Sequence, residues 1–304
     1  MRQSCAEDTL ASYLSPAFNK EAFRVDRHRP FTFICGGSDQ NGVPSLRQQF
    51  LAHVRSSAPP IFPVLAENAF LHQLVERNLQ EFETFLASTA DCVLIFVESP
   101  GSFAETGLFA ALKKIRKKTF VVNTRKQSQK DSFLNQGPIR LIYKKSDFDK
   151  VHCLDGETVT PQDANDILQF ILKNCTKYKN SLVFHPEHKF TDLELRLQLA
   201  SVYMAVTLLW AATAALTTAV LRKRFADVDA ARIERYLSLL KSIDVVGRHD
   251  EIYFTTSTKP FINDFLISSI DFLLDEVRAK TLNWHAENNS QVAVFLREQR
   301  GVGI

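Results

Sequence analysis

The chain has 304 residues, of which 45% are hydrophobic and 23% charged, with a net charge of +3. This composition excludes global disorder and predicts one large domain or two ordinary ones with packed cores. The net charge is too small to indicate nucleic-acid binding by itself. The five cysteines are widely spread without a CxxC pair, which favours reduced thiols in a cytoplasmic protein over a zinc site or a disulfide framework.

Short apolar runs alternate with helical patterns over residues 1–178. We predict an N-terminal helix or arm, then strands at 31–35, 61–65, 91–97 and 119–123, and helices at 45–55, 69–87, from 102 onward and at 164–175. A turn at 132–140 leads into the apolar residues 141–143. Strands that alternate with helices predict a parallel sheet with helices on both faces, and hence a Rossmann-like α/β domain.

A change of character after residue 178 predicts a second domain. We expect a linker at 179–195 and a mostly helical domain at 196–304. Its expected elements are a continuous helix at 193–225, a helix capped by Asp229, a hairpin with strands at 245–246 and 251–256, an apolar helix at 261–280 and a polar tail after Trp284. Two helices followed by a hairpin are typical of a winged helix.

One segment of this second domain could cross a membrane. No charged residue falls between Arg196 and Arg222, which is long enough for a span. Its many Thr, Ser and Ala residues favour a buried helix of a soluble protein instead.

The most informative motif surrounds Glu98 and Glu105. An apolar run ends at Glu98, a Ser-Pro-Gly turn follows, and a helix opens near Ser102. Ligands of open α/β sheets bind outside the carboxyl ends of the strands, so both carboxylates are expected at such an edge. Glu105 could attack C1′ of a bound ribose or stabilise an oxocarbenium-like transition state. Glu98 could orient a sugar hydroxyl or a water.

Structural roles for these acids stay open. The run from Ser102 to Glu105 also fits a capping box, in which Glu105 would only cap the helix. Glu98 could equally be a surface acid at a strand end. Asp39 and Asn123 lie at the ends of other predicted strands. They could bind hydroxyls or base edges, or they could have no role in binding.

Two further features are weaker signals. The pair Gly36-Gly37 after the first strand would let backbone approach a ligand closely, but the third glycine of a dinucleotide-binding motif is absent. Residues 113–130 hold eight Lys and Arg residues and no acid. They could form a solvated helix face or a patch that faces phosphate.

Three segments together resemble the effector proteins of bacterial retrons. They are Ile34–Gly37, the ESPGSFAETG run at Glu98–Gly107 and the SFLNQGPIRL run at Ser132–Leu141. Those effectors carry a domain similar to nucleoside 2-deoxyribosyltransferases, followed by a winged-helix domain. The resemblance covers nearly the whole chain in the same order.

The resemblance implies roles for particular residues. Glu105 matches the catalytic glutamate, and the Gly36-Gly37 turn and the Ser99–Phe103 loop match the walls of the substrate cleft. Glu98 is the expected helper from its position alone. With the residues proposed from their positions at strand ends, the expected substrate-binding residues are Cys35, Gly36, Gly37, Ser38, Asp39, Ser99, Pro100, Gly101, Ser102, Phe103 and Asn123. A family signature of unassigned role matches Asn135, Gly137, Pro138 and Arg140. The winged helix would contact nucleic acid through Arg232, Arg235, Lys241 and Arg248, although Glu234 on the same helix leaves a protein-contact role open.

The function implied is anti-phage defence by a cytoplasmic toxin. A reverse transcriptase and its branched RNA–DNA product would restrain the effector, which cleaves NAD to nicotinamide and ADP-ribose and assembles into higher-order complexes. NAD is then a substrate, and neither a cofactor nor a metal is expected. An enzymatic alternative is an N-glycosidase or deoxyribosyltransferase acting on nucleosides, nucleotides or nucleic acid. Alternatives of other classes are a non-catalytic nucleotide sensor that binds DNA and a membrane-disrupting toxin built on residues 197–221.

Overall fold

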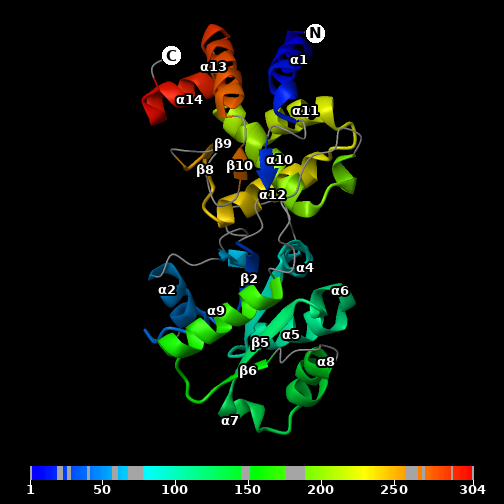
Figure 1. Ribbon diagram of the computed structural model, residues 1–304, viewed down its shortest axis with the longest axis vertical. Helices are drawn as coiled ribbons and strands as arrows, with labels where there is room; N and C mark the ends of the chain where they lie inside the picture. Colours follow the sequence, from blue (N-terminus) through cyan, green and yellow to red (C-terminus); the bar gives the residue numbers. More distant parts are fainter. Residues whose placement is uncertain are drawn as a thin grey trace. The chain divides into compact units, whose positions relative to one another are not determined.

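The computed structural model of the chain describes residues 2–18, 23–25, 29–39, 42–56, 61–67, 78–144, 151–175, 189–257, 266–268, 271–288 and 290–302. The chain divides into two compact units (Figure 1). The α/β unit comprises His28–Lys179, and the helical unit comprises Met1–Arg27 together with Asn180–Ile304. We expected the first domain to begin at residue 1, whereas its first 27 residues group with the second unit.

A five-stranded parallel sheet forms the centre of the α/β unit, as predicted, in the order β3-β2-β4-β5-β6. Its strands are β2 (Phe31–Cys35), β3 (Phe62–Val64), β4 (Cys92–Phe96), β5 (Thr119–Thr124) and β6 (Val151–Leu154). The chain runs outward in opposite directions from β2 and β4. Ligands of doubly wound sheets bind at the carboxyl ends of the strands where the order reverses, which here is the edge shared by β2 and β4.

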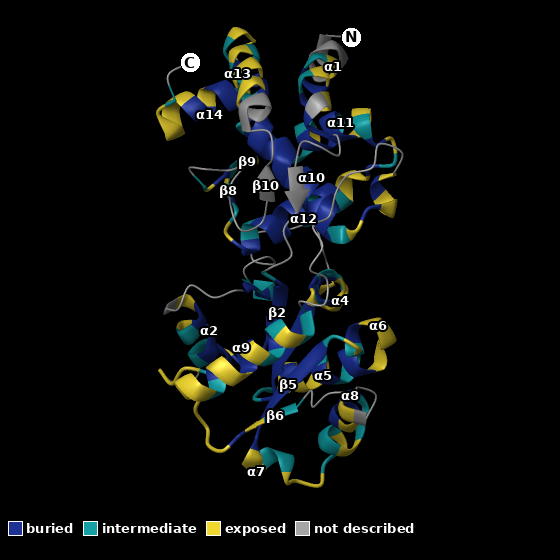
Figure 2. Ribbon diagram, viewed as in Figure 1, coloured by how far each residue is buried: buried dark blue, intermediate teal, exposed yellow. Residues whose placement is uncertain are grey.

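Helices cover both faces of this sheet. They are α2 (Leu46–Ser56), α4 (Leu79–Thr89), α5 (Pro100–Ala111), α6 (Lys113–Arg116), α7 (Arg125–Ser128), α8 (Arg140–Lys144) and α9 (Pro161–Cys175), with a π-helical turn η2 at Asn135–Ile139. One core joins α2 and α9 to the sheet through residues such as Phe50, Phe96 and Ile167. On the other face, Phe33 of β2 meets Phe109 of α5 edge to face. The strands β2, β4 and β5 are accordingly buried while the outer helix faces are exposed (Figure 2).

Two predicted elements of this unit differ from the structure. The apolar residues 141–143 lie in α8, and the last strand is Val151–Leu154, whose His152 and Cys153 break the apolar pattern expected of a buried strand. The predicted helix at 69–87 is observed from Leu79, where the Asn78 side chain accepts hydrogen bonds from two backbone N–H groups. Residues 68–77 lie outside the described residues.

The helical unit contains a three-stranded antiparallel sheet in the order β7-β9-β8. Along the chain come η3 (Phe190–Asp192), α10 (Leu195–Leu208), β7 (Ala211–Thr213), α11 (Ala214–Arg224), α12 (Ala230–Ser242), β8 (Val246–His249), β9 (Ile252–Thr255), β10 (Leu266–Ser268), α13 (Asp271–Glu287) and α14 (Gln291–Arg300). The predicted capped helix and the hairpin are both present. The segment predicted as one helix at 261–280 instead contains β10, and the polar tail forms α14 because Ser290 caps it and Val292, Phe295 and Leu296 bury one face.

The predicted continuous helix at 193–225 is interrupted at Trp210. Trp210 has a positive φ of 66°, which ends α10 and lets the chain continue as β7. Its indole Nε1–H donates to the Arg278 carbonyl at 2.8 Å, and the Arg278 guanidinium lies 3.9 Å from the ring centroid. Residues 197–208 are buried throughout, which explains their uncharged sequence. Within the described residues, no helix combines the length and hydrophobicity that a membrane crossing requires.

The N-terminal segment is an integral part of the helical unit. Helix α1 (Arg2–Leu14) packs against α11 and α13, and β1 (Phe23–Val25) pairs antiparallel with β10 (Figure 1). The ring of Phe18, in the 3₁₀ turn η1 (Ser15–Phe18), meets Phe225 edge to face at 6.2 Å, and Phe190 lies 5.6 Å from Phe225. Phe225 therefore joins the N-terminal segment to the end of α11.

We expect Phe225→Ala to destabilise the helical unit by about 3–5 kcal/mol, because truncation removes a buried ring and leaves a cavity. Both tryptophans of the chain, Trp210 and Trp284, belong to this unit. Urea unfolding followed by tryptophan fluorescence therefore reports on it. Val294→Ala, at a more exposed position of α14, is the control and should change stability little. Equal effects of both variants would contradict the assignment.

Candidate active site

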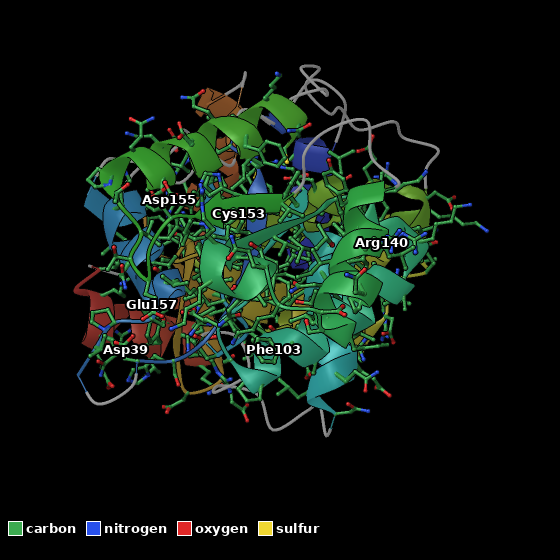
Figure 3. The ribbon with its side chains drawn as sticks, turned by 90° about the horizontal axis from the view of Figure 1, so that it is seen from below. Asp39, Phe103, Arg140, Cys153, Asp155 and Glu157 are labelled. Carbon is green, nitrogen blue, oxygen red and sulfur yellow. The ribbon has the colours of Figure 1, made fainter. Side chains whose placement is uncertain are left out.

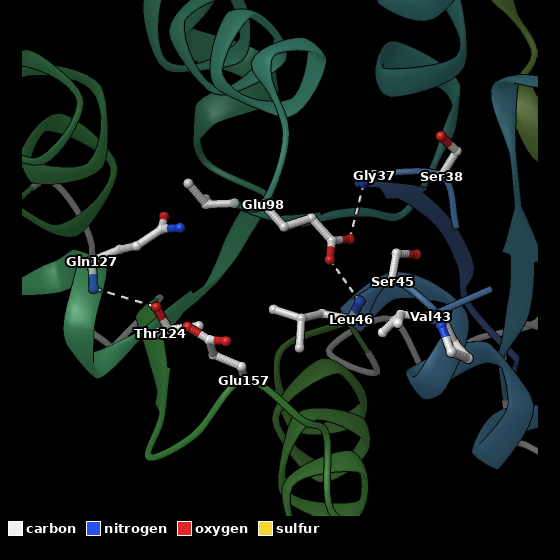
Figure 4. Close-up of a pocket in the computed structure, with 11 residues that line it drawn as sticks. Gly37, Ser38, Val43, Ser45, Leu46, Glu98, Thr124, Gln127 and Glu157 are labelled. Carbon is white, nitrogen blue, oxygen red and sulfur yellow. Dashed lines mark hydrogen bonds between the residues drawn. The ribbon is translucent and has the colours of Figure 1, made fainter. Parts of the chain in front are cut away.

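Glu98 connects the ends of β2 and β4 with the start of α2. Its Oε1 accepts a hydrogen bond from Gly37 N–H at 2.9 Å, and its Oε2 accepts from Leu46 N–H at 2.6 Å (Figure 4). Oε1 also accepts from Arg47 N–H at 3.1 Å. Ser45 Oγ accepts the next free N–H of α2, from Gln48. The carboxylate thus neutralises the positive end of the α2 dipole. Both oxygens of Glu98 are engaged by backbone, and its expected role in orienting a hydroxyl or a water stays a prediction.

The glycine pair is required by this arrangement. A Cβ on Gly36 would lie 2.7 Å from Arg47 Cβ and 2.9 Å from Glu98 Oε1. A Cβ on Gly37 would lie 3.2 Å from Glu98 Cγ. Any side chain at residue 36 would push the turn away from Glu98, so the glycines serve the close approach of backbone to this carboxylate.

Helix α5 begins earlier than predicted, which changes the position of Glu105. Ser99 is the N-cap, its Oγ accepts from Ser102 N–H, and Ser102 Oγ accepts from Ser99 N–H in return. The capping box therefore joins Ser99 and Ser102. Glu105 lies in the second turn of the helix, so the interpretation of Ser102 to Glu105 as a capping box is wrong.

Glu105 instead lines a cavity of about 510 Å³ at the carboxyl end of β2. The cavity brings together several predicted site residues, namely Cys35, Gly36, Gly37, Ser38, Ser99 and Glu105. It also contains three charged residues that the sequence did not single out, Arg47, Glu67 and Glu83. Glu105 thus faces a space large enough for a nucleoside-sized ligand.

Burial and a neighbouring carboxylate set the protonation of Glu105. Burial raises its pKa, and the charge of Glu83 on α4 raises it further, to about 7. The charge of Arg47 and a hydrogen bond from the Cys35 thiol oppose this rise. Oε2 of Glu105 is buried and has no hydrogen-bond partner among the described residues. A carboxyl group poised near neutral pH in a cavity is a candidate for nucleophilic or acid–base chemistry.

Cys35 and Glu83 complete the surroundings of Glu105. Burial, followed by the charge of Glu105, raises the pKa of the Cys35 thiol well above its usual value, so the thiol stays protonated and can donate to Glu105. Burial also raises the pKa of Glu83, while a hydrogen bond with Glu105 opposes the rise. The two carboxyl groups therefore titrate as a coupled pair.

An ion pair forms another wall of the cavity. Arg47 Nη2 lies 2.6 Å from Glu67 Oε1, and Arg47 Nη1 donates to Glu67 Oε2 at 3.2 Å. This two-point pairing is the strong form of an arginine–carboxylate contact. Arg47 is only 7% exposed, and its Nε has no partner among the described residues.

Other predicted substrate-binding residues lie outside this cavity. Pro100, Gly101 and Phe103 are exposed on α5, and Asp39 accepts a hydrogen bond from Ser45 N–H. The labelled Asp39, Phe103 and Arg140 are well separated at the surface (Figure 3). The structure therefore brings together only part of the predicted set.

Asn123 is buried, and its side chain stabilises the segment that follows β5. Its Oδ1 accepts from Thr124 N–H, and its Nδ2 lies 3.4 Å from Asn135 Oδ1. Asn135 in turn donates to the carbonyls of Gln127 and Lys130, both at 2.8 Å. In the same block Pro138 is buried, Gly137 faces the Phe133 ring, and exposed Arg140 bonds Gln136. These contacts give the matched signature a structural role in holding the segment after β5.

A second cavity, of about 420 Å³, adjoins the first along Gly37 and Ser38 (Figure 4). It lies at the ends of β4 and β5, and its lining includes Glu98, Thr124 and Gln127. Arg125 and Lys126, two cations of the acid-free stretch 113–130, lie beside the lining residues Thr124 and Gln127. Both pair with acids of the loop between β6 and α9, Arg125 with Asp155 and Lys126 with Glu157. Among the described residues, no group of three or more His, Cys, Asp or Glu side chains is arranged to hold a metal ion.

The four predicted nucleic-acid contacts lie on α12 and β8. Arg232 and Arg235 are half-buried near the start of α12, whereas Leu237, Ser238, Leu239 and Leu240 are all buried. Lys241, at the end of α12, is close enough to exposed Arg248 on β8 that its pKa is lowered, first by burial and then by the Arg248 charge. Arg248 also donates to the Asp250 carbonyl, and its guanidinium lies 5.4 Å from the centroid of the Tyr253 ring.

The titration of Glu105 should be visible in stability. Its pKa lies near 4.5 in the unfolded chain and at about 7 in the folded protein, so between these values the folded protein holds a proton that the unfolded chain has lost. The free energy of unfolding therefore falls as pH rises through this window. Glu105→Gln should remove the contribution of Glu105 to this fall, leave that of Glu83, and be more stable than the wild type above about pH 7.

Far-ultraviolet circular dichroism is the measurement, because the α/β unit contains no tryptophan. Glu81→Gln, at an exposed position of α4, is the control and should follow the wild type at every pH. Parallel stability–pH curves for Glu105→Gln and the wild type would contradict the assignment.

Comparison with known proteins identifies the family. Residues 44–248, more than half of the chain, match the family described as STM3845 retron effector protein. Among curated proteins, the "Retron Ec73 putative ribosyltransferase/DNA-binding protein" of Escherichia coli is 34% identical over 127 residues, 39% of each chain. The Retron Ec86 protein of the same description and organism is 33% identical over 127 residues, 41% of each chain. In both alignments the chain spans only about two fifths of the relative's own length. The chain belongs to the family of retron effector proteins.

Proposed function

We propose that the chain is the toxic effector of a retron anti-phage defence system and an N-glycosidase that cleaves NAD to nicotinamide and ADP-ribose. The observation that carries the proposal is the position of Glu105. Ser99 and Ser102 form the cap of α5, and Glu105 therefore does not cap the helix. Glu105 instead lines a nucleoside-sized cavity at the edge where the strand order of the sheet reverses. The names of the two curated relatives, which combine ribosyltransferase and DNA binding, support the same class of chemistry.

In this proposal, ionised Glu105 attacks C1′ of the nicotinamide ribose or stabilises its oxocarbenium-like transition state. The C1′–N bond breaks, and its electron pair leaves with nicotinamide. Water then adds its hydroxyl group to C1′ and releases a proton, which gives ADP-ribose; where Glu105 has attacked C1′, the C1′–O bond to Glu105 breaks in this step and the carboxylate is regenerated. Glu98 holds the Gly37 turn and α2 in place, and the Cys35 thiol orients Glu105.

Two other functions give different experimental results. If the substrate is a nucleoside, a nucleotide or nucleic acid, the same cavity releases a base other than nicotinamide. If a second base accepts the sugar in place of water, the chain is a deoxyribosyltransferase. If the protein is a non-catalytic sensor, it binds a nucleotide without releasing base.

Glu105→Gln should reduce nicotinamide release by at least about 10³-fold, because it removes the carboxylate without changing its size. Purified protein would be incubated with NAD, alone and with the reverse transcriptase and its RNA–DNA product, and nicotinamide measured by mass spectrometry. Wild-type activity should rise with pH to a plateau above about 7, as Glu105 loses its proton. Glu81→Gln should match the wild type.

A panel of nucleosides and nucleotides assayed in parallel separates the alternatives. Full turnover by Glu105→Gln would overturn the catalytic assignment. Release of a different base by the wild type would replace the substrate. Binding without release in every condition would favour the sensor.

The helical unit is proposed to bind the RNA–DNA product of the reverse transcriptase. Its order of helix, strand, two helices and hairpin, α10-β7-α11-α12-β8-β9, is that expected of a winged helix, and its β7-β9-β8 sheet fits the same topology. The first turns of a recognition helix and the wing contact nucleic acid in such domains. Here these positions carry Arg232, Arg235 and Arg248, with Lys241 beside Arg248.

Replacing both Lys241 and Arg248 by Ala should weaken binding of the RNA–DNA product. It should also reduce the slope of log affinity against log salt concentration by the amount expected for the loss of about two phosphate contacts. Fluorescence anisotropy over a range of salt concentrations measures both effects. Arg297→Ala, at an exposed position of α14, removes a cation elsewhere in the unit and is the control. Unchanged affinity of the double variant, with loss of reverse-transcriptase binding, would favour a protein-contact module.

A further inference from the structure

Among the described residues, the charges that line the Glu105 cavity do not cancel. These residues place three carboxyl groups there, from Glu67, Glu83 and Glu105, against one guanidinium, from Arg47. Arg47 and Glu67 are engaged with each other at 2.6 Å. Glu83 and Glu105 are therefore left as a carboxyl pair without a cation of its own among the described residues of the cavity.

A pair of this kind holds a proton when the cavity is empty. Glu83 and Glu105 line the same cavity, where burial raises the pKa of both and the charge of Glu83 raises that of Glu105 further, so the pair retains a proton near neutral pH. The neighbouring Cys35 is a protonated thiol and supplies no charge. Oε2 of Glu105 and Nε of Arg47, a residue more than nine-tenths buried, are both without a partner among the described residues. Buried polar atoms left in this way favour a polar ligand.

We propose that the Glu83–Glu105 pair selects N-glycosides whose leaving group is already a cation, as the pyridinium of NAD⁺ is, and that binding such a ligand displaces the proton of the pair. The inference rests on the proposed function and names the substrate class of that site. A pyridinium nitrogen leaves as a neutral base by keeping the electron pair of the C1′–N bond, so its departure needs no acid. The base of a neutral nucleoside must instead be protonated, and its binding would keep the proton in the cavity.

The test compares two ligands that differ in ring charge. Carbocyclic NAD⁺, whose glycosidic bond resists cleavage, carries the pyridinium cation, and its reduced form carries a neutral dihydropyridine. Isothermal titration of the full chain should give at least about tenfold tighter binding of the oxidised form. Repeating the titration in buffers of different ionisation enthalpy should reveal release of a proton with the oxidised form alone.

Glu83→Gln should reduce the preference for the oxidised form by about tenfold and abolish proton release, because a single carboxylate remains. Loss of the Glu83 charge should also lower the pKa of Glu105 and move the acidic limb of nicotinamide release to lower pH. Glu81→Gln, two residues away on the exposed face of α4, should behave as the wild type in each measurement.

Each contrary result has a separate meaning. Equal wild-type affinity for the two forms would overturn the inference and leave NAD cleavage standing. A preference for the oxidised form that Glu83→Gln does not change would overturn the role of the pair. Failure of both forms to bind would overturn the inference together with NAD as the substrate.

Discussion

The carboxylate of Glu98 is the constraint on which the candidate site depends. It holds the N–H groups of Gly37, Leu46 and Arg47, and so ties the end of β4 to the turn after β2 and to the first residues of α2. These elements meet where the strand order of the sheet reverses. An open edge of the sheet thereby becomes a wall of fixed shape, and the backbone of Gly36 fits only because no side chain stands there.

Two glutamates seven residues apart thus have opposite environments. Glu98 is engaged by three backbone donors at the end of a strand, whereas Glu105 projects from the second turn of a capped helix toward Glu83 and Cys35. Carboxylates whose surroundings differ in this way commonly divide structural and chemical roles between them. The turn from Ser99 to Gly101 creates the difference, because it converts one strand end into the start of a helix.

The parallel sheet and the importance of Glu105 could be predicted from sequence, since both depend on local pattern. Apolar runs ended by Gly or Pro mark β2 and β4, and the ESPGSFAETG motif marks the cavity. Glu83 could not be found in this way, because one acid beside the apolar residues of an amphipathic helix carries no local signal, and its role depends on contact with α5. Trp210 likewise ends α10 through contacts with distant Arg278. The capping box was misplaced by three residues because Ser102 to Glu105 matches the usual Ser-x-x-Glu pattern, whereas the observed box has a serine, Ser102, at the position of the glutamate.

The pairing of β1 with β10 has a consequence for synthesis of the chain. Phe23 is synthesised long before its strand partner Ser268. The sheet and the cavity of the α/β unit consist of residues within 28–179, so they can form before β1 pairs with β10. A nascent chain can therefore complete the cavity proposed for catalysis before the helical unit has all of its elements, so any effect of the helical unit on that cavity comes later in synthesis.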